Sequence, residues 1–322
     1  YSFSFAPRRN WSRTYARQPE ILAYLESVCD DFDLRRHLVT GTRVRSARWS
    51  ESTLTWTVDT ESRSGEAQLV ADVVVSAVGL FGEPKLPDIE GLARFRGPMM
   101  HTSRWDDSVD LTGKRVAVIG TGASAVQVVP ELAKTAATVT VFQRTPPWMV
   151  PKDDRPFTAA ELSRFRRLPW AARRERWRLW KEQHDNTALR ADDPLVAQRQ
   201  EIGERFLHRQ VPDERLRAAL TPDYPFRCKR VLLGADYYAA LQSDHVDLVT
   251  EPIREVTETS VGAVDVDAVV LATGFQTCHY LSGIDVFGTG GQSLHARWAD
   301  DPTAYLGVAV SGFPNFFMLY GP

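Results

Sequence analysis

Apolar residues in the first part of the chain follow two different periods, and each period predicts a different element. After Gln18-Pro19-Glu20 they recur at helical spacing, which predicts a helix because proline suits the first helical turn. Leu54, Trp56 and Val58 then alternate with threonines, as in a half-buried strand, and residues 43–49 are the expected hairpin partner. Residues 73–75 are consecutive valines, which is typical of a strand buried on both faces.

The residues from Arg115 to Leu132 combine a predicted strand, a glycine turn and a predicted helix. A GxGxxA motif in this setting is typical of dinucleotide binding, because the first glycine permits a tight turn, the second admits a pyrophosphate, and the alanine lets helix and strand pack closely. Free N–H groups at the helix start also attract phosphate. We therefore predict that a dinucleotide binds here, at Gly120, Thr121, Gly122, Ala123, Ser124 and Ala125.

The next predicted strand, residues 138–142, ends without an acidic residue. Proteins that bind NAD usually have a carboxylate at this position, which accepts hydrogen bonds from the ribose hydroxyls. This chain has Gln143, Arg144 and Thr145 instead, and the planar guanidinium of Arg144 suits a 2′-phosphate. We therefore predict NADP(H) in preference to NAD(H). In the alternative, Arg144 points to solvent and binds nothing.

The pattern D-x-V-V-x-A-x-G occurs twice, at residues 72–79 and 267–274. Each copy predicts a buried strand that runs into a glycine turn. Because glycine has no side chain, such a turn lets a flat or charged ligand approach the backbone closely. Alternatively, the two copies are hydrophobic strands that resemble each other by chance.

Arginine and tryptophan dominate the stretch from about Thr158 to Thr221. The arginines suggest either an acidic partner or, as we expect, a solvated helical face on which Glu175 and Glu182 are interspersed. The tryptophans recur at helical spacing, and we interpret them as core residues. They are Trp170, Trp177 and Trp180.

Length and charge limit the class of protein. A chain of 322 residues suggests about two domains, and 39 basic against 41 acidic residues give no electrostatic reason to expect nucleic acid. No apolar run approaches the roughly 18 residues that span a bilayer, so we expect no membrane partner. Cys29, Cys228 and Cys278 lie far apart, which favours a reduced, cytoplasmic enzyme. We expect no metal, because the histidines at 245, 279 and 295 lack ligand spacing.

A more specific motif stands between the two predicted α/β regions. Residues 95–106 fit F-x-G-x-x-x-H-x-x-x-W-[P/D] at every fixed position, which resembles the signature of the type I Baeyer–Villiger monooxygenases. The ending Trp105-Asp106 favours this branch over related flavin monooxygenases that oxidise nitrogen or sulfur. The fixed residues are Phe95, Gly97, His101, Trp105 and Asp106.

The resemblance covers nearly the whole chain and implies FAD, NADPH and O2 as cofactors and co-substrate, with a ketone converted to an ester or lactone. It implies that Arg230 is the catalytic arginine, since a fixed cation stabilises the anionic attacking species and the developing oxyanion. Lys229 is expected to hold the 2′-phosphate with Arg144 and Thr145. Thr273 and Gly274 are expected at a strand-end turn near a nucleotide. His101 is expected to hydrogen-bond a moving linker, not to act as a base.

The resemblance also predicts the organisation of the chain: two dinucleotide-binding, Rossmann-like α/β domains of the flavin monooxygenase type, the FAD domain incomplete. We expect partial FAD-binding segments at 1–86 and 268–322, a linker with the signature at 87–110, and an NADP-binding domain at 111–157 and 222–267. Residues 158–221 would form a helical insertion that caps the substrate cavity.

The family's FAD-binding GxGxxG and an active-site aspartate have no counterpart here, so we expect an internal fragment of a larger enzyme. Two alternatives to the Baeyer–Villiger activity remain open. One is a flavin monooxygenase that oxidises nitrogen or sulfur, and the other is a non-catalytic NADP(H)-binding fragment.

Overall fold

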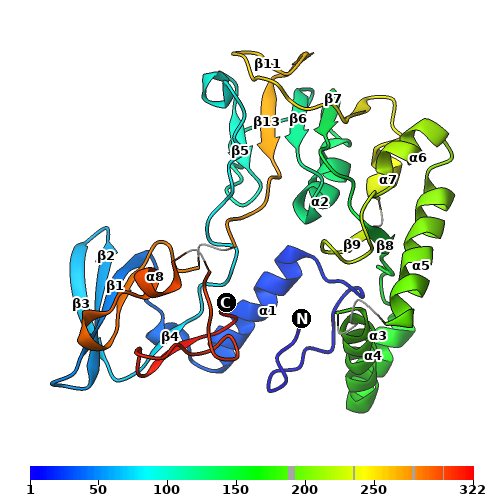
Figure 1. The fold of residues 1–322 in the computed structure, drawn as a ribbon. Helices are drawn as coiled ribbons and strands as arrows, with labels where there is room; N and C mark the ends of the chain where they lie inside the picture. The colour runs from blue at the N-terminus through cyan, green and yellow to red at the C-terminus, as the bar shows by residue number, and fades with distance from the viewer. Residues whose placement is uncertain (188–192, 235, 278–279, 300) are drawn as a thin grey trace. The chain divides into compact units, whose positions relative to one another are not determined.

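The structure, a computed structural model, describes residues 1–187, 193–234, 236–277, 280–299 and 301–322, and side chains are not described for 183–187. Cys278 and His279 therefore lie outside the described residues. The chain forms two compact units. Unit 1 comprises Tyr1–Arg36 and Asp88–Ala272, and unit 2 comprises His37–Pro87 and Thr273–Pro322 (Figure 1).

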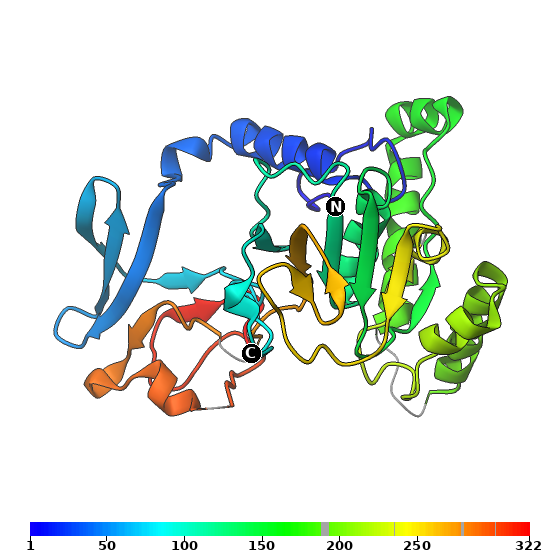
Figure 2. The same cartoon turned by 90° about the horizontal axis from the view of Figure 1, so that it is seen from above.

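Unit 1 is built around a parallel five-stranded sheet in the order β10-β7-β6-β13-β5 (Figures 1 and 2). Its central strands are continuous apolar runs, as expected for parallel strands covered on both faces. Alternate residues face two cores, one shared with helix α2 and one with the hairpin β11–β12. The strands are β5 (Met99–His101), β6 (Arg115–Ile119), β7 (Thr138–Phe142), β10 (Val246–Val249), β13 (Ala268–Leu271), β11 (Ser260–Val261) and β12 (Val264–Asp265).

Helices and a small sheet complete unit 1. Thr158 forms a capping box with Glu161, while Asp193 and Asp213 cap two later helices through their carboxylates. Strand β8 (Met149–Pro151) pairs with β9 (Leu232–Gly234) in parallel. The helices are α1 (Gln18–Asp31), α2 (Ala123–Leu132), α3 (Ala159–Arg167), α4 (Pro169–Thr187), α5 (Pro194–Gln210), α6 (Glu214–Leu220) and α7 (Tyr237–Ala240), with a 3-10 turn at η2 (Leu92–Arg94).

The interpretation of the tryptophans in this stretch as core residues is wrong. Trp170, Trp177 and Trp180 are 59, 58 and 58% exposed, respectively. The packed side of α4 instead carries small or short residues such as Ala171, because α4 packs closely against α3. Helices α3 to α6 lie within residues 158–221, while the assignment of this stretch as an insertion stays a prediction.

Unit 2 contains a four-stranded sheet in the order β14-β1-β2-β3. The predicted hairpin is confirmed, with Trp49 opposite Trp56, although Leu54 lies in the turn before the strand. The blue strands and the orange and red residues form one core around the fully buried Trp56 (Figure 1). The elements are β1 (Thr42–Ser50), β2 (Thr55–Ser62), β3 (Gly65–Ala71), β14 (Asp285–Phe287), α8 (Leu294–Trp298) and η3 (Thr289–Gly291), with η1 (Arg35–His37) at the junction.

The two copies of the repeat end in glycine turns as predicted, since Gly79 and Gly274 have φ angles of 71° and 85°. Burial of the first copy on both faces is wrong. Strand β4 (Val74–Ser76) has one described strand partner, β15 (Phe316–Met318), and Val75 is 53% exposed. Strand β13 pairs with β5 and β6 along its two edges, and its two faces pack into the two cores of unit 1, so all four of its residues are buried.

Two expected segment boundaries differ from the compact units. Strand β13 was expected with the FAD-binding segment, but Ala268 pairs with Val116 of β6, so the strand belongs to unit 1. Residues 1–36 also belong to unit 1. Within the expected linker, Met99–His101 form the edge strand β5. The assignment of the segments to FAD or NADP stays a prediction.

Candidate functional site

The glycine turn between β6 and α2 has an open backbone. Gly120 has a φ angle of 108°, which residues with a side chain rarely adopt, and its N–H donates to the Phe142 carbonyl at 3.0 Å. Gly122 is the N-cap of α2, makes no side-chain cap, and has no atom within 4 Å of where a Cβ would lie. Ala125 is fully buried beneath the turn. The first N–H groups of α2 are therefore accessible to an anion.

The end of β7 lies against this turn. Thr121 Oγ1 donates to the Thr145 carbonyl at 2.9 Å, which ties the turn to the segment that contains Arg144. Gln143 is buried and donates to the Ala219 carbonyl at 2.7 Å, so no carboxylate occupies this strand end. Arg144 is exposed, and its guanidinium has no hydrogen-bond or ion-pair partner within the described ranges. The cation is thus free to meet a phosphate.

Lys229 is held near the same segment by Tyr224. The Tyr224 hydroxyl donates to the Pro146 carbonyl at 3.0 Å, and Lys229 Nζ lies 4.5 Å from the centre of the Tyr224 ring. The structure therefore brings Lys229 into the neighbourhood of Thr145, as the proposed 2′-phosphate site requires. Burial raises the pKa of the Tyr224 phenol above its ordinary value, so the ring stays neutral beneath the lysine.

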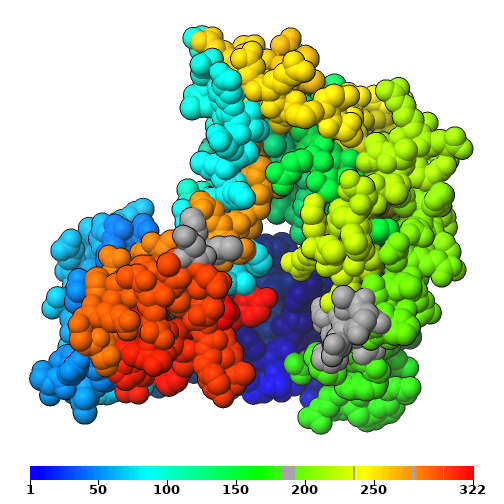
Figure 3. All heavy atoms as spheres, viewed as in Figure 1, coloured from blue at the N-terminus to red at the C-terminus, as the bar shows by residue number. Residues whose placement is uncertain are grey.

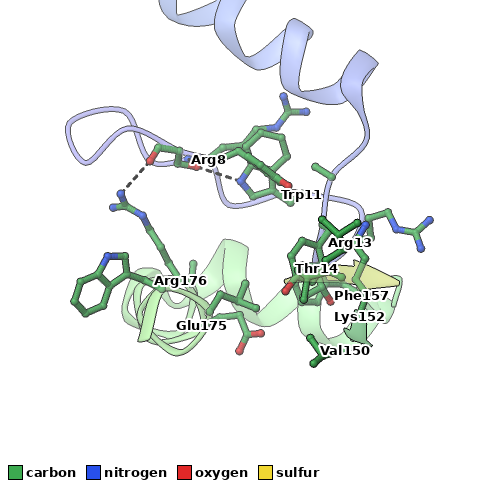
Figure 4. Close-up of a pocket in the computed structure, with 18 of the residues that line it drawn as sticks. Arg8, Trp11, Arg13, Thr14, Val150, Lys152, Phe157, Glu175 and Arg176 are labelled. Atoms are coloured by element: carbon green, nitrogen blue, oxygen red, sulfur yellow. Dashed lines mark hydrogen bonds between the residues drawn. The ribbon is translucent and has the colours of Figure 1, made fainter. Parts of the chain in front are cut away.

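A cavity of about 980 Å³ lies in unit 1 (Figure 4). Its walls are residues of the N-terminal segment (Tyr1–Ala16), the start of α2, strands β8 and β9, helices α3, α4 and α5, and residues 226–231. The N-terminal segment is held in the wall by backbone hydrogen bonds, from Thr14 N–H to the Arg155 carbonyl and from Phe157 N–H to the Ser12 carbonyl, both 3.0 Å. The volume is sufficient for a cofactor or small substrate.

The cavity wall is strongly basic. Glu175 is the one acidic residue among its described lining residues, and ten are basic. Asp154, just outside the lining, forms ion pairs with two of them. Its Oδ1 lies 2.7 Å from Arg13 Nε and its Oδ2 lies 3.4 Å from Lys152 Nζ. Burial tends to raise the pKa of Asp154, but these two cations outweigh it and hold the pKa below its ordinary value. The basic residues are Arg8, Arg9, Arg13, Lys152, Arg173, Arg176, Arg199, Arg227, Lys229 and Arg230.

Arg230 lies on this wall with Lys229 and with Ala123 of the glycine motif. The backbone segment that contains Arg230 is anchored on both sides. On one side Phe226 is buried and packs edge-on against Trp148, with 5.4 Å between the ring centres, and on the other side strand β9 begins at Leu232. The Arg230 side chain is exposed to the cavity and has no partner within the described part of the chain. An unpaired guanidinium on an anchored backbone can meet an anionic reacting group.

The signature motif lies against the sheet, not in the cavity. His101 is 5% exposed, and its Nδ1 accepts from the Ser103 N–H at 3.2 Å. Trp105 is partly exposed, and Asp106 accepts from Ser108, which lowers the pKa of its carboxyl. None of these residues lines the cavity. A positioning role for His101 is compatible with this burial, and a role as general base stays unsupported.

Gly97 of the signature is fixed by close packing. A Cβ there would lie 2.5 Å from the Asp267 carbonyl oxygen and 2.7 Å from Phe95 Cε1. We expect Gly97→Ala to cost about 1–3 kcal/mol of unfolding free energy, because the backbone must shift. Thermal unfolding of the full-length protein measures this. Gly82→Ala is the matched control, because no atom lies within 4 Å of its Cβ position, and an equal loss in both variants would contradict the packing explanation.

Thr273 and Gly274 follow β13 after one residue, Ala272, and belong to unit 2. Thr273 Oγ1 donates to the Lys85 carbonyl at 2.5 Å, and the Lys85 N–H donates to the Gly274 carbonyl at 2.9 Å. Gly274 has open space where a Cβ would lie. A backbone turn that could face a ligand is therefore present, while its assignment to a nucleotide stays a prediction.

The sequence did not indicate the cavity wall formed by the N-terminal segment or by Gln127. The segment from Tyr1 to Ala16 has no periodic pattern, so only its arginines and aromatic residues could have marked it. Gln127 lies one helical turn from Ala123, whose carbonyl accepts from its side chain at 2.8 Å. Among the described residues, no group of histidine, cysteine, aspartate or glutamate could hold a metal.

The parallel sheet and the open glycine turn belong to an α/β fold of the flavin monooxygenase type. Residues 2–168 match the family model described as flavin-binding monooxygenase-like, and the chain belongs to this family. The resemblance to the type I Baeyer–Villiger monooxygenases is confirmed by relatives and by solved structures.

Similar proteins include a Baeyer–Villiger monooxygenase of Streptomyces coelicolor, 41% identical over 329 residues, and the FAD-binding monooxygenase ktnD of Aspergillus niger, 39% identical over 339 residues. Both matches cover 100% of this chain, and it spans 62% and 55% of their lengths. Cyclohexanone monooxygenase from Rhodococcus sp. Phi1 bound to NADP+ is structurally similar, with a TM-score of 0.85, 34% identity, and coverage of 100% of this chain and 69% of that one.

Proposed function

We propose that this chain is part of a flavoprotein Baeyer–Villiger monooxygenase that uses FAD, NADPH and O2 to convert a ketone into an ester or lactone. The observation that carries the proposal is the basic cavity, whose wall combines the start of α2 with Lys229 and Arg230. Named relatives that include a Baeyer–Villiger monooxygenase and a cyclohexanone monooxygenase support the same reaction.

The described residues fit a phosphorylated nicotinamide cofactor. The accessible N–H groups of α2 would hold the pyrophosphate, and the open space at Gly122 lets it approach the backbone. Arg144, Thr145 and Lys229 would hold the 2′-phosphate. Solved relatives bound to NADP support this choice of cofactor.

FAD, when bound, supplies the oxygen chemistry, which ordinary side chains do not provide. We propose that the turn at Thr273 and Gly274 approaches it. Within the cavity, Arg230 keeps a positive charge toward the reacting groups and stabilises negative charge as it develops on the ketone oxygen. Helices α3 and α4 contribute part of the cavity wall and would restrict which ketone enters.

A flavin monooxygenase that oxidises sulfur or nitrogen is the second candidate, because it would need the same two cofactors. Full-length protein supplied with NADPH and air should convert a cyclic ketone to a lactone faster than it oxidises a thioether. Chromatography of both product mixtures measures this. Sulfoxide as the main product, with no lactone, would assign the second function, and no product with a colourless protein would favour a non-catalytic NADP(H)-binding protein.

A cytoplasmic location belongs to this proposal and is supported by the scattered cysteines. Within the described parts of the chain, no helix is both long enough and apolar enough to cross a bilayer.

A further inference from the structure

Helix α4 presents an aromatic and basic face to solvent. At about 100° per residue, Trp170, Arg173, Arg174, Trp177, Trp180 and Lys181 fall within an arc of about 120°. We call this arc the outer face of α4. Each of its tryptophans is more than half exposed, and its three cationic residues are exposed as well. Figure 3 shows the green residues of this helical region at the edge of unit 1.

Glu175 and Glu182, the two acidic residues of the helix whose side chains are described, lie on its other side. Glu175 pairs with Arg178 at 2.7 Å and Glu182 pairs with the same guanidinium at 3.4 Å. Among the residues of α4 with described side chains, the outer face therefore carries cations and no carboxylate. The charge extends into the end of α3, because the stretch 164–182 carries eight basic and two acidic residues. The basic residues are Arg164, Arg166, Arg167, Arg173, Arg174, Arg176, Arg178 and Lys181.

Exposed tryptophans beside cations favour contact with the headgroups of anionic lipids. Trp170 and Trp177 make no ring contact or hydrogen bond within the described structure, although each ring is large enough to fill a core position. Tryptophan is enriched at the level of lipid headgroups, where its ring is half apolar and half wet. Basic residues next to a tryptophan are attracted by the negative surface potential of anionic lipids.

We propose that the outer face of α4 docks on an anionic lipid surface. Charge complementarity selects this occupant, because the described side chains of the face include three cations, no carboxylate, and indoles that can enter the headgroup layer. We expected no membrane partner because the sequence has no long apolar run. That observation bears only on segments that span a membrane. Peripheral binding needs no such segment.

The position of the face relates it to the cavity of the same unit. Arg173 and Trp180 at one border of the face also line the cavity. A docked protein would therefore hold the cavity close to ketones dissolved in the bilayer. This consequence rests on the proposed function, whereas the lipid docking itself does not.

Co-sedimentation of full-length protein with vesicles tests the proposal. Vesicles of equal parts phosphatidylcholine and phosphatidylglycerol should bind the protein, pure phosphatidylcholine should not, and added salt should release it. Arg174→Glu should weaken binding roughly 30-fold, at about fivefold for each of two charge units. Arg63→Glu, which reverses an exposed arginine in unit 2, should leave binding unchanged.

A second variant, Trp170→Ser/Trp177→Ser, keeps every charge and should weaken vesicle binding at least roughly tenfold. Thermal unfolding shows whether each variant is folded, and Arg174→Glu remains decisive should the tryptophan variant not fold. Equal affinity for the two vesicle types, or an equal loss in Arg63→Glu, would overturn the proposal. So would binding of a single-stranded oligonucleotide in place of vesicles, or a dimer that Trp170→Ser/Trp177→Ser dissociates.

Discussion

Replacing Arg230 with alanine in the full-length enzyme is expected to slow ester formation at least 100-fold while NADPH binding changes little. The backbone segment of Arg230 is anchored between Phe226 and β9, and its guanidinium faces the cavity and has no protein partner in the described ranges. Its charge is therefore available to a reacting anion. Removing one such electrostatic contact typically costs about 10²–10³-fold in rate.

The rate of lactone formation and the affinity for NADP+ should be measured together for Arg230→Ala. Arg215→Ala is the matched control, because Arg215 is exposed on α6, outside the cavity wall. Arg230→Lys should recover only part of the rate, since lysine keeps the charge but not the planar donor fork. Lactone formation in Arg230→Ala at close to the wild-type rate, or a parallel loss of NADP+ affinity, would refute the catalytic role.

Arg144→Ala is expected to remove the preference for the phosphorylated cofactor. Arg144 follows the end of β7 in the segment tied to the glycine turn, where no carboxylate would repel a 2′-phosphate. A charge-assisted hydrogen bond contributes about 1.5–3 kcal/mol, so kcat/KM with NADPH should fall roughly 10- to 150-fold. With NADH, which lacks this phosphate, kcat/KM should barely change.

Steady-state kinetics with both cofactors, on wild type and Arg144→Ala, provide the measurement. Arg215→Ala again serves as the control for loss of an exposed arginine. Wild-type protein that uses NADH as well as NADPH, or a variant that loses both activities equally, would contradict the assignment of Arg144.

The glycine turn could be predicted because the local sequence fixes it. The valines before Gly120, the turn residues and the small Ala125 each specify one part of the strand–turn–helix unit, and no distant contact is needed. The hairpin around Trp56 was predictable for the same reason, since alternation and a short turn define it locally.

Features that depend on distant contacts were missed. The two D-x-V-V-x-A-x-G strands have the same pattern, yet β13 has two sheet neighbours and β4 has one described neighbour, because pairing partners come from elsewhere in the chain. The spacing of Trp177 and its neighbours indicates a helix but not which side of it is packed. The cavity wall at Tyr1–Ala16 is irregular, so periodicity carries no information there.

A crystal structure of the full-length protein with NADP+ tests the central claim most directly. The account predicts the pyrophosphate at the N-terminus of α2, the 2′-phosphate within hydrogen-bond distance of Arg144, and the nicotinamide end in the cavity that Arg230 lines. A cofactor bound elsewhere, with residues 120–125 covered by protein and Arg230 turned away from it, would contradict the account.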